Sequence, residues 1–150
     1  MRNTKVRSWA LAAFVAAGAI SALGSGANAA DDGRAFRGHA TGAITGATSP
    51  VDLVEYTGQG TQMGNFTRYE TIHINADGTI EGSITFFSTH GDISVDVAGQ
   101  FTAADGSAVA GTYTITGGEG RFEGATGTAT FEGTLIEGVV EIDYEGSIDY

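Results

Sequence analysis

Apolar and polar residues alternate with a period of two through most of the chain after residue 30. No segment repeats its apolar residues at the three- and four-residue spacing of a helix. Glycine accounts for 24 residues, and 21 of them follow residue 29, a density that opposes long helices. The pattern predicts an all-β chain with strands over residues 34–45, 51–62, 65–75, 79–89, 92–102, 108–116, 121–135 and 139–150.

The connections between these strands are short and carry turn residues. Asn75–Gly78, His90–Gly91 and Glu137–Gly138 place Asn, Asp or Gly where a reversal of the chain needs them. Loops of this length join neighbouring antiparallel strands. The predicted topology is therefore a meander.

The alternation also assigns the two faces of the sheet. One face collects large apolar side chains, whereas the other is rich in Thr, Ser, Asp and Glu. No amphipathic helix is predicted that could cover the apolar face, so this face has to be buried in a sandwich or a barrel. Eight strands in a meander favour a closed, up-and-down, calycin-like barrel. The residues predicted to face inward are Ile80, Ile84, Phe86, Ile93, Val95, Val97, Phe101, Val109, Tyr113, Ile115, Ala125, Ala129, Phe131, Leu135, Val140, Ile142, Tyr144, Ile148 and Tyr150.

Six glycines share this inward face, and two compatible interpretations follow. They allow the strands to coil and bend as closure requires, or their missing side chains leave a cavity for one small ligand. The six are Gly82, Gly99, Gly111, Gly127, Gly133 and Gly146.

The third predicted strand breaks the pattern with two charges. Arg68 and Glu70 share the parity of the apolar Phe66 and Ile72, and each unpaired buried ion costs several kcal/mol. Two arrangements would expose both charges, namely a bulge beside Gly64 that reverses the parity or a strand that starts above the rim of the barrel. Otherwise they line one end of a mostly apolar cavity, where Arg68 would orient a carboxylate or carbonyl group, and Glu70 would polarise it or accept a proton.

The predicted ligand-binding set consists of these two residues together with three inward rings. Tyr113 and Tyr144 could contribute phenolic hydrogen bonds, and Phe86 an apolar wall. Glu70 is the candidate catalytic residue, and no further catalytic group is assigned.

The N-terminal segment has the features of a secretory signal. Three basic residues lie among the first seven, an uncharged apolar run covers residues 9–23, and Ala27–Ala29 has the small-x-small pattern of a cleavage site. We expect residues 1–29 to be removed and residues 30–150 to form one domain that is exported to the periplasm or the medium. The apolar run is shorter than the ~20 residues of a membrane span, so no span is predicted.

Removal of the predicted signal peptide changes the net charge and the residue types of the remaining chain. The three lost charges are all positive, so Lys and Arg together fall from 7 to 4 and the net charge moves from −11 to −14. The remaining chain has no Lys, Cys or Trp, which excludes thiolate and Schiff-base chemistry and disulfides. Its acidity opposes binding to nucleic acid and to anionic membranes.

No metal or cofactor is predicted. The three histidines, His39, His73 and His90, are far apart and lack the spacing of metal ligands. The sequence contains no phosphate loop, dinucleotide fingerprint or nucleophile elbow.

One glycine-rich segment carries a family resemblance. Residues 116–127, Thr-Gly-Gly-Glu-Gly-Arg-Phe-Glu-Gly-Ala-Thr-Gly, resemble the Gly-Gly-x-Gly-x-Phe-x-Gly-x-x-Gly stretch of allene oxide cyclases and, more loosely, the corresponding turn of dirigent proteins. The segments Gly64–Thr67 and Thr89–Asp92 resemble those of small exported bacterial members of the same barrel superfamily, whose function is unknown.

The resemblance implies a closed eight-stranded barrel with an apolar cavity, frequently assembled as a homotrimer. Allene oxide cyclases bind an oxidised fatty acid and steer its cyclisation without a cofactor, and dirigent proteins steer the coupling of phenolic radicals outside the cell. The N-terminal catalytic glutamate of the cyclases has no matched position here. Glu55 and Glu70 both have the required character.

Three functions are consistent with these observations. The first is an exported barrel that binds a small apolar or amphipathic molecule without transforming it. The second is a cofactor-independent cyclase or isomerase of the allene oxide cyclase type, acting on an oxidised lipid or related molecule. The third is a surface or scaffold protein, which a filled lumen and a wide exposed apolar patch would favour.

Overall fold

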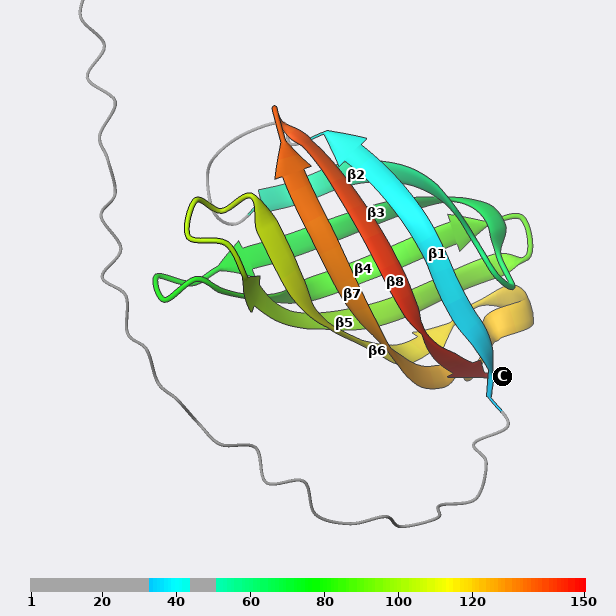
Figure 1. The fold of residues 1–150 in the computed structure, drawn as a ribbon. Coiled ribbons are helices and arrows are strands. Elements are labelled where there is room, and N and C mark those ends of the chain that lie inside the picture. Colours follow the sequence, from blue (N-terminus) through cyan, green and yellow to red (C-terminus); the bar gives the residue numbers. More distant parts are fainter. Residues whose placement is uncertain (1–32, 44–50) are drawn as a thin grey trace, which may run out of the picture. The chain divides into compact units, whose positions relative to one another are not determined.

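The computed structural model describes residues 33–43 and 51–150. The predicted signal peptide and its cleavage site lie outside the described residues. The described chain is a closed barrel of eight antiparallel strands, in which each strand pairs with the next and β8 pairs with β1 (Figure 1). The predicted all-β, up-and-down barrel is confirmed.

The strand boundaries lie within two residues of the predicted ones, except at the start of β7. They are β1 (Arg34–Ala43), β2 (Val51–Gly60), β3 (Gly64–Ile74), β4 (Thr79–Ser88), β5 (Gly91–Phe101), β6 (Ala108–Gly118), β7 (Thr126–Ile136) and β8 (Val139–Asp149), and a 3-10 turn, η1 (Gly120–Phe122), lies between β6 and β7.

The predicted strand over residues 121–135 begins too early. The backbone of Gly120 and of Gly124 has positive φ, at 64° and 75°, which an extended strand does not accommodate. The chain instead turns through η1 and tucks the fully buried Phe122 under the barrel. Hydrogen bonds from the amide of Arg121 to the carbonyl of His90 and between Asp92 and Glu119 tie the turn to the neighbouring hairpin.

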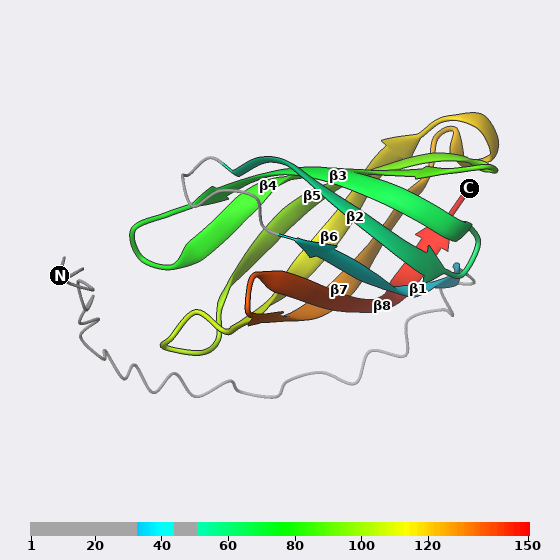
Figure 2. The same cartoon turned by 90° about the horizontal axis from the view of Figure 1, so that it is seen from above.

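The two ends of the barrel therefore differ. The connections 61–63, 89–90 and 119–125 meet at one end, hereafter the η1 end. The connections 75–78, 102–107 and 137–138 meet at the other, hereafter the open end. Figure 2 shows the barrel turned by 90°, with the η1 segment and the β3–β4 and β5–β6 hairpins at opposite ends.

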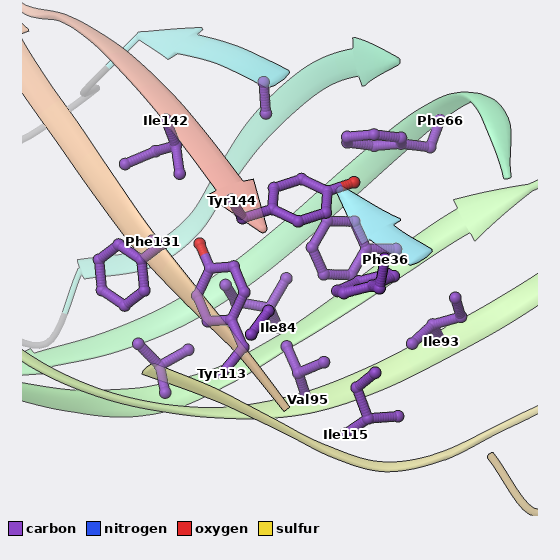
Figure 3. Close-up of a cluster of buried hydrophobic side chains, with 14 of the residues drawn as sticks. Phe36, Phe66, Ile84, Ile93, Val95, Tyr113, Ile115, Phe131, Ile142 and Tyr144 are labelled. Atoms are coloured by element: carbon purple, nitrogen blue, oxygen red, sulfur yellow. The ribbon is translucent and has the colours of Figure 1, made fainter. Parts of the chain in front are cut away.

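The interior matches the predicted parity. Of the nineteen apolar residues predicted to face inward, fifteen are buried, and the remaining four, Phe101, Val109, Leu135 and Tyr150, are partly buried against the core. Strands β1 to β3 add Phe36, Ala40, Tyr56 and Phe66. Figure 3 shows these side chains converging from all sides of the barrel.

Aromatic rings fill the half of the lumen nearer the η1 end. Phe86 lies 5.2 Å from Phe66, 5.7 Å from Tyr144 and 5.9 Å from Phe36, measured between ring centroids. Such pairs contribute about 0.5–1.5 kcal/mol each beyond their buried area. This aromatic cluster, Phe36, Phe66, Phe86 and Tyr144, makes that half of the barrel a packed core. Figure 3 shows Phe36, Phe66 and Tyr144 of the cluster close together.

The inward glycines support closure rather than a cavity. A side chain at Gly82 or Gly146 would collide with a backbone carbonyl of the neighbouring strand, and one at Gly99 or Gly111 would meet the ring of Phe131. None of the six predicted glycines lines the cavity described below. Neighbouring atoms already occupy the space beside these glycines, so the interpretation that their missing side chains create the cavity is wrong. The interpretation that they let the strands coil and bend stays a prediction.

Candidate ligand-binding site

Arg68 and Glu70 are buried inside the barrel. Their exposed fractions are 1% and 9%. The pairing of β3 with β2 runs without interruption from Gly64 to Glu70, and its pairing with β4 runs without interruption from Phe66 to Ile74. No bulge beside Gly64 therefore turns the two side chains outward. The alternative in which both charges are exposed is therefore wrong.

The guanidinium of Arg68 joins three groups. Its Nη2 donates a hydrogen bond to Oε2 of Glu70 at 2.8 Å, and its Nη1 donates to the hydroxyl of Tyr113 at 2.9 Å. Its Cζ lies 4.3 Å from the ring centroid of Tyr56, within the range of a cation–π contact. These four residues, from β2, β3 and β6, form what we call the polar floor.

A cavity of about 110 Å³ lies between the polar floor and the open end. Apart from Arg68, Glu70 and the two tyrosines, its walls are apolar side chains and glycine. Its lining consists of Tyr56, Arg68, Glu70, Ile72, Ile74, Ile80, Ile84, Val97, Phe101, Gly106, Ala108, Val109, Tyr113, Phe131, Leu135, Val140 and Ile142.

Three of the five predicted ligand-binding residues, Arg68, Glu70 and Tyr113, line this cavity. The other two, Phe86 and Tyr144, belong to the aromatic cluster on the far side of the polar floor. Phe86 lies 5.7 Å from the Cζ of Arg68. The hydroxyl of Tyr144 is buried and has no hydrogen-bond partner among the described residues.

Tyr56 belongs to the polar floor but was not among the predicted site residues. The alternation contains a signal for it, because Glu55 and Thr57 flank it with polar side chains and so place Tyr56 on the inward face.

The mouth of the cavity is apolar. Ile136 and Val139 pair across the β7–β8 hairpin and are 64% and 42% exposed. Ile74, at the end of β3, is also exposed. Of these three exposed residues, Ile74 also lines the cavity, and Ile136 and Val139 lie at the same end of the barrel.

Burial shifts the pKa values of the side chains in the polar floor. It raises the pKa of Glu70 above its ordinary value, against the opposing effects of Arg68 and of a hydrogen bond from Tyr56. Burial disfavours the charge on Arg68, but Tyr113, Glu70 and Tyr56 raise its pKa overall, so the guanidinium stays protonated. Burial also raises the pKa of Tyr56 and of Tyr113, and both phenols keep their protons at neutral pH.

The other candidates from the sequence lie outside the lumen. His39 contacts Asp143 at 2.9 Å on the outer surface, and His73, His90 and Glu55 are exposed. Within residues 33–43 and 51–150, no three His, Asp or Glu side chains gather as metal ligands would. The same part of the chain contains no helix with the length and apolar character needed to cross a membrane.

Comparison with known proteins supports the fold. No protein-family model and no curated protein sequence matches the chain. A solved structure of a pterocarpan synthase dirigent protein matches with a TM-score of 0.50, covering 78% of this chain and 84% of that chain at 12% sequence identity. At this identity the match shows the dirigent-like barrel fold alone. The resemblance of residues 116–127 to allene oxide cyclases and to exported bacterial proteins stays a prediction.

Proposed function

We propose that this dirigent-like barrel binds a small apolar or amphipathic molecule in the cavity at its open end, without a requirement to transform it. The observation that carries the proposal is the polar floor at the base of an otherwise apolar cavity. Well-packed apolar residues are often as stabilising as a buried ion pair, or more so. Stability alone therefore does not explain the buried pair of Arg68 and Glu70, whereas ligand binding does.

The shape of the cavity indicates how such a ligand would lie. Its polar end would meet the polar floor, where Nε of Arg68 is buried and has no hydrogen-bond partner among the described residues. Its apolar part would contact Ile72, Val109 and Leu135. The volume of about 110 Å³ is below the ~300 Å³ at which pockets for drug-sized ligands begin, so a longer ligand would extend past Ile136 into solvent.

Native mass spectrometry of protein purified from its own host tests for a bound molecule directly. A panel of fatty acids, fatty alcohols and phenols, measured by thermal shift and calorimetry, tests for binding in vitro. We expect Val109→Phe, which fills the cavity, to weaken the best panel ligand at least ~10-fold. The matched control Val139→Phe adds the same ring at the exposed rim and should bind nearly as the unchanged protein does. The proposal fails if no molecule co-purifies and no panel compound shifts melting.

A second candidate, a cofactor-independent cyclase or isomerase, is supported by one observation. Glu70 has a carboxyl group beside the cavity with a pKa raised by burial, and such a shift brings a carboxyl closer to the range useful for proton transfer at neutral pH. Turnover of an oxidised-lipid and phenolic panel should then be lost in Glu70→Gln while ligand binding is largely kept. Unchanged turnover in this variant would remove Glu70 from the mechanism.

The scaffold hypothesis receives less support. A scaffold role is favoured by a lumen that side chains fill completely. The open end of the barrel instead contains a cavity. It would regain weight if the ligand experiments above fail.

Export and assembly complete the proposal. Cleavage after Ala29 is to be tested by the intact mass of the protein recovered from the periplasm or medium of its host. The homotrimer implied by the family resemblance is to be tested by sedimentation velocity, in which a monomer at all concentrations would refute it.

A further inference from the structure

The outer surface of the barrel carries two exposed aromatic rings on adjacent strands. Tyr69 of β3 and Phe87 of β4 are 36% and 41% exposed. Their ring centroids lie 5.7 Å apart with an interplanar angle of 73°. Both occupy the outward parity, which otherwise carries mainly polar residues on these strands. No part of the lumen site uses them.

Two shallow recesses flank Phe87 and share its ring as a wall. One, of about 820 Å³, extends over the outer faces of β1 to β4 and contains Thr57, Gln59 and Thr67. The other, of about 400 Å³, lies beside Tyr69 and contains Thr71, Ser83 and Thr85. Most of the residues that line each recess carry a hydroxyl or an amide group beside apolar side-chain and ring surface, and each of these polar groups can donate and accept hydrogen bonds.

The linings of the two recesses contain few charged residues although the chain has 18 acidic residues. Among the described residues that line the two recesses, the titratable side chains are His39, Tyr69 and Glu70, and Glu70 points into the lumen. Carboxylates border the region instead, with Glu55 opposite Tyr69 on β2 and Asp92 opposite Phe87 on β5. An anionic ligand would be repelled at this border.

We propose that this surface, hereafter the Tyr69–Phe87 face, binds a neutral oligosaccharide or polysaccharide. A pyranose ring has an apolar C–H face that packs on an aromatic ring, and hydroxyl groups at its edge that exchange hydrogen bonds with Thr, Ser, Asn and Gln side chains. The face supplies both kinds of contact, in two recesses that meet at Phe87.

A second copy of the chain is the competing occupant, and the composition of the face disfavours it. The buried core of a protein interface is enriched in apolar and aromatic residues and depleted in Ser, and a standard interface buries about 1,200–2,000 Å². Here two aromatic rings stand among hydroxyl groups. The other large exposed hydrophobic residues, Ile74, Ile136 and Val139, lie at the open end of the barrel.

The test uses purified protein with cellohexaose, maltohexaose, xylohexaose and mannohexaose as neutral probes and polygalacturonate as the anionic one. We expect calorimetry to detect binding of at least one neutral probe and none of polygalacturonate. The double variant Tyr69→Thr/Phe87→Thr should weaken that binding at least ~10-fold, as for loss of a hot spot. Threonine suits an outward strand position, so the barrel should fold.

Matched controls distinguish this surface from the lumen and from general damage. Thr112→Ala/Thr130→Ala changes two outward residues on another pair of adjacent strands, β6 and β7, and should leave oligosaccharide affinity unchanged. Binding of the best lumen ligand should be equal in the Tyr69→Thr/Phe87→Thr variant and the unchanged protein.

Three results would overturn the proposal. The first is the absence of binding to all four neutral probes. The second is equal oligosaccharide affinity in the Tyr69→Thr/Phe87→Thr variant. The third is concentration-dependent self-association that this variant abolishes, since a second copy of the chain would then occupy the face. If the double variant fails to fold, Phe87→Thr alone provides the same comparison.

Discussion

The two halves of the lumen are built from the same alternating pattern, but side chains fill one half and leave a cavity in the other. Toward the η1 end, the aromatic cluster packs ring against ring, and Phe122 is buried beneath it. Toward the open end, aliphatic side chains such as Ile72 and Leu135 leave a cavity under short hairpins. Inward parity therefore decides which side chains are buried, whereas ring size and the connection at each end decide whether the space is filled.

The polar floor lies at the boundary between the halves. Arg68 contacts Tyr56 and Tyr113 at the base of the cavity and approaches Phe86 of the aromatic cluster. Because the filled half excludes water on one side, the ion pair with Glu70 is held in a medium of low polarity. The predictions below test this division, beginning with the largest expected effect.

Truncation in the filled half should cost more stability than truncation in the open half. Phe86→Ala removes a fully buried ring that contacts four other aromatic residues, and we expect a loss of about 3–5 kcal/mol. Leu135→Ala at the partly buried cavity wall should cost about 1–2 kcal/mol. Urea unfolding followed by circular dichroism measures both. Equal losses would mean that the open half is as tightly packed as the filled half.

Breaking the ion pair should cost about 3 kcal/mol at pH 7. Arg68→Met keeps much of the side-chain volume but leaves the Glu70 carboxylate unpaired in the lumen. The double variant Arg68→Met/Glu70→Gln removes that buried charge, so it should be more stable than Arg68→Met alone. A double-mutant cycle from urea unfolding gives the coupling, and additive losses would show that the two charges do not interact.

The pH dependence of stability should carry a smaller contribution from Glu70. Its folded-state pKa is raised by burial above the ordinary value of 4.5, so the folded state holds the proton more tightly than the unfolded state. This contribution is fully present below pH 4.5 and is lost as the pH rises through the folded-state pKa, by ~1.4 kcal/mol per unit of upward shift.

The matched control for this titration is Glu70→Gln, which keeps the shape of the side chain and cannot ionise. Urea unfolding of both proteins from pH 4 to 8 should show the unchanged protein losing stability relative to the variant as the pH rises. Parallel curves over that range would contradict the raised pKa of Glu70.

The sequence predicts the face of a residue well and its height in the barrel poorly. A period of two places Arg68, Glu70, Phe86 and Tyr144 on the inward face, and all four are buried. Whether an inward residue reaches the cavity depends on the stagger between strands, which arises from long-range pairing and leaves no local signal. For this reason the sequence places Phe86 and Tyr144 in the ligand-binding set, although neither residue lines the cavity.

Two further differences have local causes. Phe122 and Ala125 are both buried although they lie three residues apart, so the period of two is broken between them. This break, together with the glycines at positions 120 and 124, is the local signal of the 3-10 turn. Phe87 lies next to the inward Phe86 and so must point outward. Parity alone therefore places Phe87 on the outer face.

The pairing of β1 with β8 has a kinetic consequence. It joins the first described strand to the last through ten register pairs, and Arg34 adds a hydrogen bond to the carbonyl of Tyr150 and a cation–π contact with its ring. Each of these contacts spans about a hundred residues or more, and contacts of such separation slow folding. Until β8 reaches β1, the partly folded sheet presents two unpaired edges to neighbouring chains. Closure of this seam therefore marks the moment at which a newly made molecule ceases to be prone to aggregation.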